Sequence, residues 1–108
     1  MKFYLKEVML MNSIEYKFEK GNDFERFAAY ENGVEAGEVT FTRAGDEILI
    51  IDHTYVDENF RGKNIAVDLV KHVVDLAIEE KKKIVPLCPF ARREFNQKPE
   101  YQEIEYKG

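Results

Sequence analysis

The chain of 108 residues has the length of one ordinary domain, so we expect a single domain over residues 1–108 with its core at about residues 14–104. With 44% hydrophobic and 34% charged residues it is neither disordered nor fibrous, and a net charge of −5, with basic residues scattered among acids, argues against nucleic-acid binding. Charged residues interrupt the N-terminus and no later run reaches the length of a membrane span, so we expect a cytoplasmic protein without a membrane partner.

The first half of the chain has the alternating pattern of β-strands, in which every second residue is apolar. Asn32-Gly33 favours a type I′ turn because both residues tolerate a positive φ. Connections as short as this one join antiparallel neighbours. The predicted meander has about four strands, at residues 14–18, 24–31, 34–43 and 47–56.

The second half of the chain changes to the period of a helix. Apolar residues recur at i, i+4 spacing from Ile65 to Ile78, which predicts an amphipathic helix there. A short buried strand is predicted at residues 84–87, and the strand-helix-strand order makes it parallel to the strand before the helix. Two further elements complete the prediction, a short helix at residues 89–97 and a final strand at residues 101–106.

The turn before the long helix has the basic, glycine-containing sequence Arg61-Gly62-Lys63-Asn64. In a βαβ unit the start of the helix faces the ends of the parallel strands, and free backbone N–H groups there attract anions. Gly62 lets the backbone approach a ligand, and Asn64 tolerates a left-handed conformation. These residues predict a phosphate-binding turn, and a solvated loop with a helix cap is the alternative on local sequence alone.

Residues 56–66 resemble the acyl-CoA signature of the GNAT N-acetyltransferase superfamily, whose core is Arg or Gln, two variable residues, Gly, one variable residue and then Gly or Ala. Arg61 and Ala66 match the two ends of this core. Asn64 stands where the family normally has its central glycine, and asparagine is the mildest replacement on backbone grounds. The resemblance implies that acetyl-CoA is bound, as a co-substrate, by Val56, Arg61, Gly62, Lys63, Asn64, Ile65 and Ala66.

Residues 53–56, 86–91 and 98–101 extend the resemblance to a small stand-alone GNAT-like subfamily of about this length. That subfamily is a shortened GNAT domain that lacks helices between its first strands. The resemblance therefore implies an α+β or α/β fold, in which an antiparallel meander is followed by a helix, a parallel strand and a short helix. It also implies transfer of an acetyl group to an amine, and the sequence does not say whether this amine is a small molecule or a protein.

Cys88 is the single cysteine of the chain, and the resemblance places it near the acyl thioester. As a nucleophile it needs a base, and His53 is the nearest suitable partner in the expected strand layout. Protonation of the departing CoA thiolate and simple packing are the alternative roles for Cys88. A single cysteine forms neither an internal disulfide nor a multi-cysteine metal site, so we expect no metal.

Two other functions stay open on the sequence. A non-catalytic acyl-CoA-binding module or sensor is compatible with the lack of an evident glutamate base. An interaction protein would instead use an exposed edge of the sheet. The oligomeric state is open as well.

Overall fold

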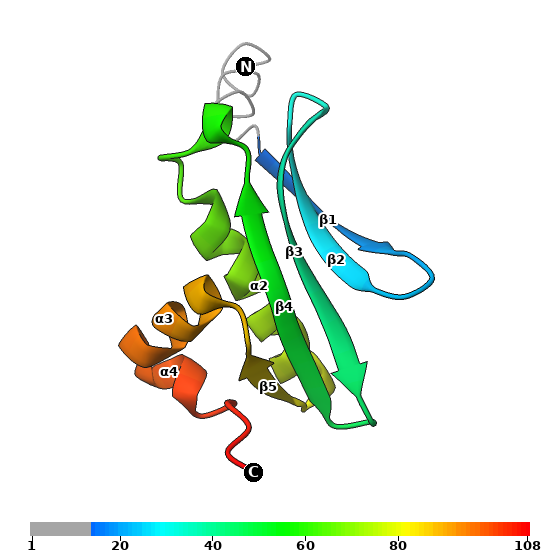
Figure 1. Cartoon of the computed structure of the whole chain (residues 1–108), viewed down its shortest axis with the longest axis vertical. Coiled ribbons are helices and arrows are strands. Elements are labelled where there is room, and N and C mark those ends of the chain that lie inside the picture. Colours follow the sequence, from blue (N-terminus) through cyan, green and yellow to red (C-terminus); the bar gives the residue numbers. More distant parts are fainter. Residues whose placement is uncertain (1–13) are drawn as a thin grey trace, which may run out of the picture.

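The computed structural model describes residues 14–108 and contains a five-stranded sheet with one long helix (Figure 1). The expectation of an N-terminus without a signal peptide concerns residues 1–13, which lie outside the described residues. The elements in chain order are β1 (Ile14–Lys20), β2 (Glu25–Glu31), β3 (Val34–Ala44), β4 (Ile48–Val56), the 3-10 helix η1 (Glu58–Phe60), α2 (Ile65–Glu80), β5 (Lys83–Pro86), α3 (Pro89–Gln97) and α4 (Pro99–Gln102).

The strands follow one another across the sheet in the order β1-β2-β3-β4-β5. The first four pair antiparallel, and β5 pairs parallel with β4. The predicted meander and the predicted parallel βαβ unit are therefore both confirmed. The turn between β2 and β3 has φ 52° at Asn32 and φ 82° at Gly33, which are the positive values that a type I′ turn requires.

Helix α2 packs across one face of the sheet, and the hydrophobic core lies between them (Figure 1). The predicted apolar stripe of α2 is buried from Ile65 to Ala77, and it meets strand residues such as Phe41 and Leu49 that are fully buried. We call this side of the sheet the helix face. The opposite side, which carries charged side chains such as Arg26, is the open face.

A β-bulge in β4 reverses the alternation of its side chains. The pairing of β4 with β3 skips Asp52, so one extra residue lies between Ile51 and His53. In a regular strand Ile51 and His53 would point to the same face. Because of the bulge, Thr54 follows Ile51 onto the helix face, whereas His53 lies on the open face.

The final strand predicted at residues 101–106 is wrong, because the chain forms the short helix α4 over the first part of this segment. Tyr101 packs against Phe95 of α3 with the ring centroids 5.3 Å apart, which draws the chain into a turn. Only the end of the segment pairs with the sheet, where the N–H of Tyr106 donates to the carbonyl oxygen of Ile84 at 2.8 Å. This contact covers the outer edge of β5.

None of the helices among residues 14–108 is long and apolar enough to cross a membrane.

Candidate functional site

A small groove of about 210 Å³ opens at the N-terminus of α2. Six of the seven residues predicted to bind the coenzyme line it, and the exception is Lys63. Three further lining residues were not predicted as coenzyme ligands, because η1, the first turn of α2 and α3 meet there only in the folded chain. The full lining is Val56, Phe60, Arg61, Gly62, Asn64, Ile65, Ala66, Val67 and Phe90.

The turn that leads into α2 has two residues with left-handed backbones. Gly62 has φ +87°, a value that residues with a Cβ rarely adopt. Asn64 has φ 61° and ψ 23°, the left-handed region that asparagine tolerates best after glycine. The asparagine in place of the signature glycine is therefore compatible with the backbone that this position requires.

The first turn of α2 keeps its backbone N–H groups available. Asn64 is the N-cap residue, but its side chain makes no capping hydrogen bond with any part of the chain that the structure describes. The first N–H groups of a helix have no partner within the helix, and the helix dipole makes this end positive. The groove is therefore built at a place that favours an anion.

The two basic side chains of the turn point in different directions. Arg61 Nε donates to the carbonyl oxygen of Val56 at 3.2 Å, which holds the guanidinium beside the groove. Lys63 Nζ lies 2.8 Å from Glu31 Oε1 and 5.7 Å from the ring centroid of Phe60. Lys63 is thus paired with β2 and lies outside the lining of the groove, a pairing that arises only in the folded chain.

Strand β4 extends past the end of β5. The last parallel pair joins Ile51 to Pro86, whereas β4 continues to Val56. After β5 the chain turns away at Cys88, whose N–H donates to the carbonyl oxygen of Ile51 at 3.2 Å. Residues 52–56 of β4 therefore lie beyond the last pair with β5, with Thr54 beside Cys88 and Val56 in the lining of the groove.

Cys88 is the N-cap residue of α3 and is only 5% exposed. Its Sγ accepts a hydrogen bond from the backbone N–H of Ala91 at 3.5 Å and lies 3.4 Å from Thr54 Oγ1. Thr54 belongs to the stretch that carries the resemblance, but nothing in its sequence position indicated a contact with the thiol. The bulge at Asp52 creates this contact by turning Thr54 to the helix face.

The predicted partnership of His53 with Cys88 is wrong. His53 Nε2 lies 2.8 Å from Glu38 Oε2 on the open face, and the side chain is 53% exposed. Cys88 contacts Thr54 on the helix face, and neighbouring residues of a strand point to opposite faces. The thiol and the imidazole therefore lie on opposite sides of β4.

Arg26 fixes the carboxylates of the open face. Its guanidinium binds Glu19 at 2.6 Å, Glu35 at 2.9 Å and Glu38 at 2.7 Å. Partial burial pushes the pKa of Glu38 upward, but hydrogen bonds from Arg26 and His53 outweigh it, and the pKa lies below the usual glutamate value. Glu38 is therefore ionised at neutral pH.

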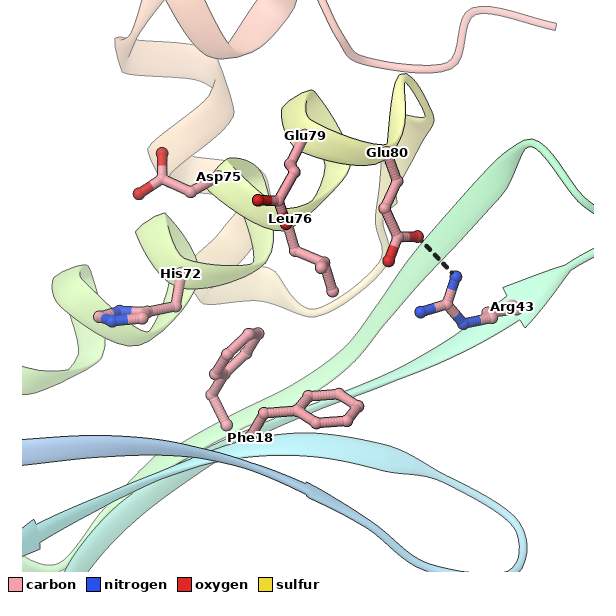
Figure 2. A pocket seen from close by; sticks show the side chains of 8 residues that line it. Phe18, Arg43, His72, Asp75, Leu76, Glu79 and Glu80 are labelled. Atoms are coloured by element: carbon pink, nitrogen blue, oxygen red, sulfur yellow. Dashed lines mark hydrogen bonds and ion pairs between the residues drawn. The ribbon is translucent and has the colours of Figure 1, made fainter.

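A second hollow, of about 400 Å³, lies between the sheet and the C-terminal half of α2 (Figure 2). At one end of it Arg43 donates to Glu80 at 2.9 Å, the contact drawn in the figure. None of the predicted site residues lines this hollow. Its lining residues are Phe18, Phe27, Arg43, His72, Asp75, Leu76, Glu79 and Glu80.

Metal-ligating side chains do not gather in the described part of the chain: no group of three or more His, Cys, Asp or Glu residues there is placed to hold a metal ion.

Residues 26–104 match the sequence model of a protein family described as GCN5-related N-acetyl-transferase. Among solved structures, a ribosomal-protein-alanine N-acetyltransferase from Brucella melitensis biovar Abortus 2308 is 28% identical with a TM-score of 0.61, and the match covers 72% of this chain and 64% of that one. A GCN5-like protein from Staphylococcus aureus is 25% identical with a TM-score of 0.64, and the match covers 83% of this chain and 87% of that one.

A GNAT family acetyltransferase from Elizabethkingia anophelis, solved with acetyl-CoA bound, has a TM-score of 0.63 at 16% identity. That match covers 80% of this chain and 74% of the other, and at this identity it shows a common fold alone. The chain spans 64% of the length of the Brucella enzyme, which is less than two thirds. No curated protein matches the chain.

Proposed function

Since this chain belongs to the GCN5-related N-acetyl-transferase family, we propose that it moves an acetyl group from acetyl-CoA to an amine. The observation that carries the proposal is the groove at the uncapped N-terminus of α2, with Arg61 beside it and two left-handed residues in the turn. Backbone N–H groups and a guanidinium are the donors that phosphate oxygens prefer. The pyrophosphate of coenzyme A is the anion that the family's chemistry brings to this place.

The rest of the coenzyme has a path along β4. Val56 lines the groove, and two residues back Thr54 lies beside Cys88. A thiol-bearing arm that follows residues 56 to 52, where β4 has passed the end of β5, brings its thioester next to Cys88. We expect the reactive end of acetyl-CoA on this path to lie beside the part of β4 that extends past β5.

In this arrangement we expect Cys88 to protonate the departing CoA thiolate and not to act as a nucleophile that carries the acetyl group. A nucleophilic cysteine needs a base within hydrogen-bond reach, and the thiol has Thr54 and a backbone N–H as its polar neighbours. A thiol hydrogen-bonded beside the scissile bond is suited to protonate the CoA thiolate as the carbon–sulfur bond breaks. His53, on the other face, does not take part in this proton transfer.

Transfer itself is tested by mass spectrometry and thiol release with acetyl-CoA and a panel of primary amines. We expect acetylated amine and free CoA without an acetylated Cys88 intermediate. The variant Cys88→Ser keeps an N-cap acceptor for α3 and should slow turnover by about 10²-fold, since one positioned proton donor is worth that much. Accumulation of acetyl-Cys88 contradicts the assigned role, and coenzyme binding without any transfer contradicts the enzymatic function.

The two basic residues of the turn are predicted to differ in their effects on coenzyme binding. Arg61→Ala should weaken CoA binding by roughly 10- to 150-fold, because a charge-assisted phosphate contact is worth about 1.5 to 3 kcal/mol. Lys63→Ala should change it by less than about threefold, since Lys63 pairs with Glu31. Isothermal titration calorimetry of both variants measures the difference. No heat with the unmodified protein refutes the site, and equal losses refute the distinction between the two side chains.

A further inference from the structure

We propose that the second hollow, between the sheet and the C-terminal half of α2, binds a small organic cation, a protonated amine that carries an apolar group. The volume of the hollow, about 400 Å³, is within the range of small-molecule sites, which is about 300 to 1,000 Å³. Among the described residues, the hollow and the groove at the N-terminus of α2 have no lining residue in common. Binding in the hollow is therefore separate from the proposed acetyl transfer and does not depend on it.

The helices cover the sheet unevenly, which leaves the hollow open. α2 packs chiefly on β2, β3 and β4, and α3 packs on β4 and β5. β1 lies at the end of the sheet opposite β5, so its helix face is less covered than that of the central strands. Phe18 of β1 is 48% exposed there, and Leu76 extends from α2 toward it across the hollow (Figure 2).

The floor of the hollow is made of aromatic rings. Phe18 and Phe27 meet edge to face with their ring centroids 5.6 Å apart, and the ring of His72 lies 5.4 Å from that of Phe27. Leu76 adds an aliphatic side chain to this surface. The faces of aromatic rings carry a partial negative charge, so they attract a cation as well as the apolar part of a ligand. The floor therefore favours a ligand with an apolar group.

The rim of the hollow carries more negative than positive charge. Its acidic lining residues are Asp75, Glu79 and Glu80, and its basic lining residue is Arg43. The guanidinium of Arg43 is already engaged on two sides, with Glu80 at 2.9 Å and with Glu25 at 2.6 Å. The positive charge of Arg43 is thus compensated by the chain itself, and the excess at the rim is negative.

Glu79 is the carboxylate that remains for a ligand. Asp75 pairs with Lys71 at 3.0 Å, whereas Glu79 has no ion-pair partner within residues 14–108. The side chain of Glu79 extends from α2 on the same side as Leu76 (Figure 2). An ammonium group above the aromatic floor is attracted by the rings and by this carboxylate, whereas an anion is repelled by it. The charge of the hollow is therefore complementary to a protonated amine.

The charge preference is measured with three ligands of nearly the same shape, phenethylamine, 2-phenylethanol and 3-phenylpropionate, by two-dimensional NMR titration of the full chain at neutral pH. We expect the side-chain signals of Phe18, Phe27 and Leu76 to shift. The ammonium should bind about 3- to 30-fold more tightly than the alcohol, the combined effect of an exposed ion pair and a cation–π contact, and the carboxylate should bind most weakly. Absence of binding, equal affinities, or shifts confined to the groove near Phe60 and Phe90 overturn the proposal.

Two pairs of variants test the residues of the hollow. Glu79→Gln should weaken phenethylamine binding about 2- to 5-fold and leave 2-phenylethanol binding unchanged, and Glu100→Gln, which removes an exposed carboxylate of α4, is its control. Phe18→Ala should weaken the binding of both ligands about fivefold. Phe24→Ala is the control for it, since Phe24 lies in the turn between β1 and β2, is 43% exposed and does not line the hollow. Equal losses in a variant and its control contradict the site.

The capped peptide Phe-Lys-Phe distinguishes a free amine from a lysine side chain of a partner protein. A stable protein interface covers about 800 Å² on each partner, which is much more surface than the eight residues of the hollow offer. We therefore expect the peptide to bind no more tightly than phenethylamine. Binding of the peptide at least about tenfold more tightly than the free amine, at the same NMR signals, overturns a small molecule as the occupant.

Discussion

The substitution Ala66→Asp is expected to weaken coenzyme A binding by at least roughly 10- to 150-fold while leaving the fold intact or slightly stabilised. Ala66 lines the groove in the first turn of α2, where a ligand phosphate meets the backbone N–H groups. A carboxylate there repels phosphate and competes for its donors, and each lost charge-assisted contact costs about 1.5 to 3 kcal/mol. The same carboxylate lies at the positive end of the helix dipole, which should stabilise the folded state by about 0.3 to 1 kcal/mol.

Ala66→Asp should weaken CoA binding without lowering the stability of the fold. Measuring both quantities therefore distinguishes loss of the site from unfolding. Calorimetry with CoA measures binding, and thermal unfolding followed by circular dichroism measures stability. Ala66→Asn is the matched control, because asparagine has the size of aspartate without its charge. If Asn and Asp at position 66 weaken binding equally, steric filling of the groove is responsible and the anion site is refuted. Unchanged CoA affinity in Ala66→Asp refutes it as well.

The substitution Phe41→Ala is expected to lower the free energy of unfolding by about 3 to 5 kcal/mol. Phe41 is fully buried on β3, the central strand of the sheet, and its ring stacks on Phe27 with the centroids 6.0 Å apart. Removing it leaves a cavity under α2 that the surrounding strands cannot fill. A domain of this length has about 5 to 15 kcal/mol of stability in total, so the variant should be close to unfolding at room temperature.

Urea and thermal unfolding measure the loss, and the melting temperature should fall by at least about 12 °C. Phe18→Ala is the control of identical chemistry, since Phe18 packs near Phe41 but is 48% exposed. Phe18→Ala should lower the free energy of unfolding clearly less than Phe41→Ala, because about half of the Phe18 side chain faces solvent. Equal losses in the two variants contradict the assignment of Phe41 to the centre of the core.

Local patterns in the sequence were sufficient for most of the fold. Alternation of apolar residues and the Asn32-Gly33 turn predicted the meander, and the i, i+4 line from Ile65 predicted α2. These patterns are readable because strand and helix periodicity depend on residues a few positions apart. The final strand failed for the same reason: the contact of Tyr101 with Phe95, which favours a helical turn there, joins two separate elements.

The candidate groove was predictable for a related reason. Gly62 and Asn64 favour the left-handed backbone of the turn by their own chemistry, and Arg61 adds a charge, so consecutive residues specify most of the candidate groove. The hydrophobic walls were not predictable in this way. Phe60 and Phe90 are thirty residues apart and meet only because β5 returns the chain to the start of α2.

The sequence by itself determined the meander, the parallel βαβ unit and the left-handed backbone of the turn before α2, because these follow from neighbouring residues. The tertiary structure alone decided which side chains meet across β4. Skipping Asp52 in the pairing turns Thr54 toward Cys88 and His53 toward Glu38, although regular alternation would have put His53 on the helix face. A bulge depends on the register of two strands, and that register is set by packing over the whole sheet.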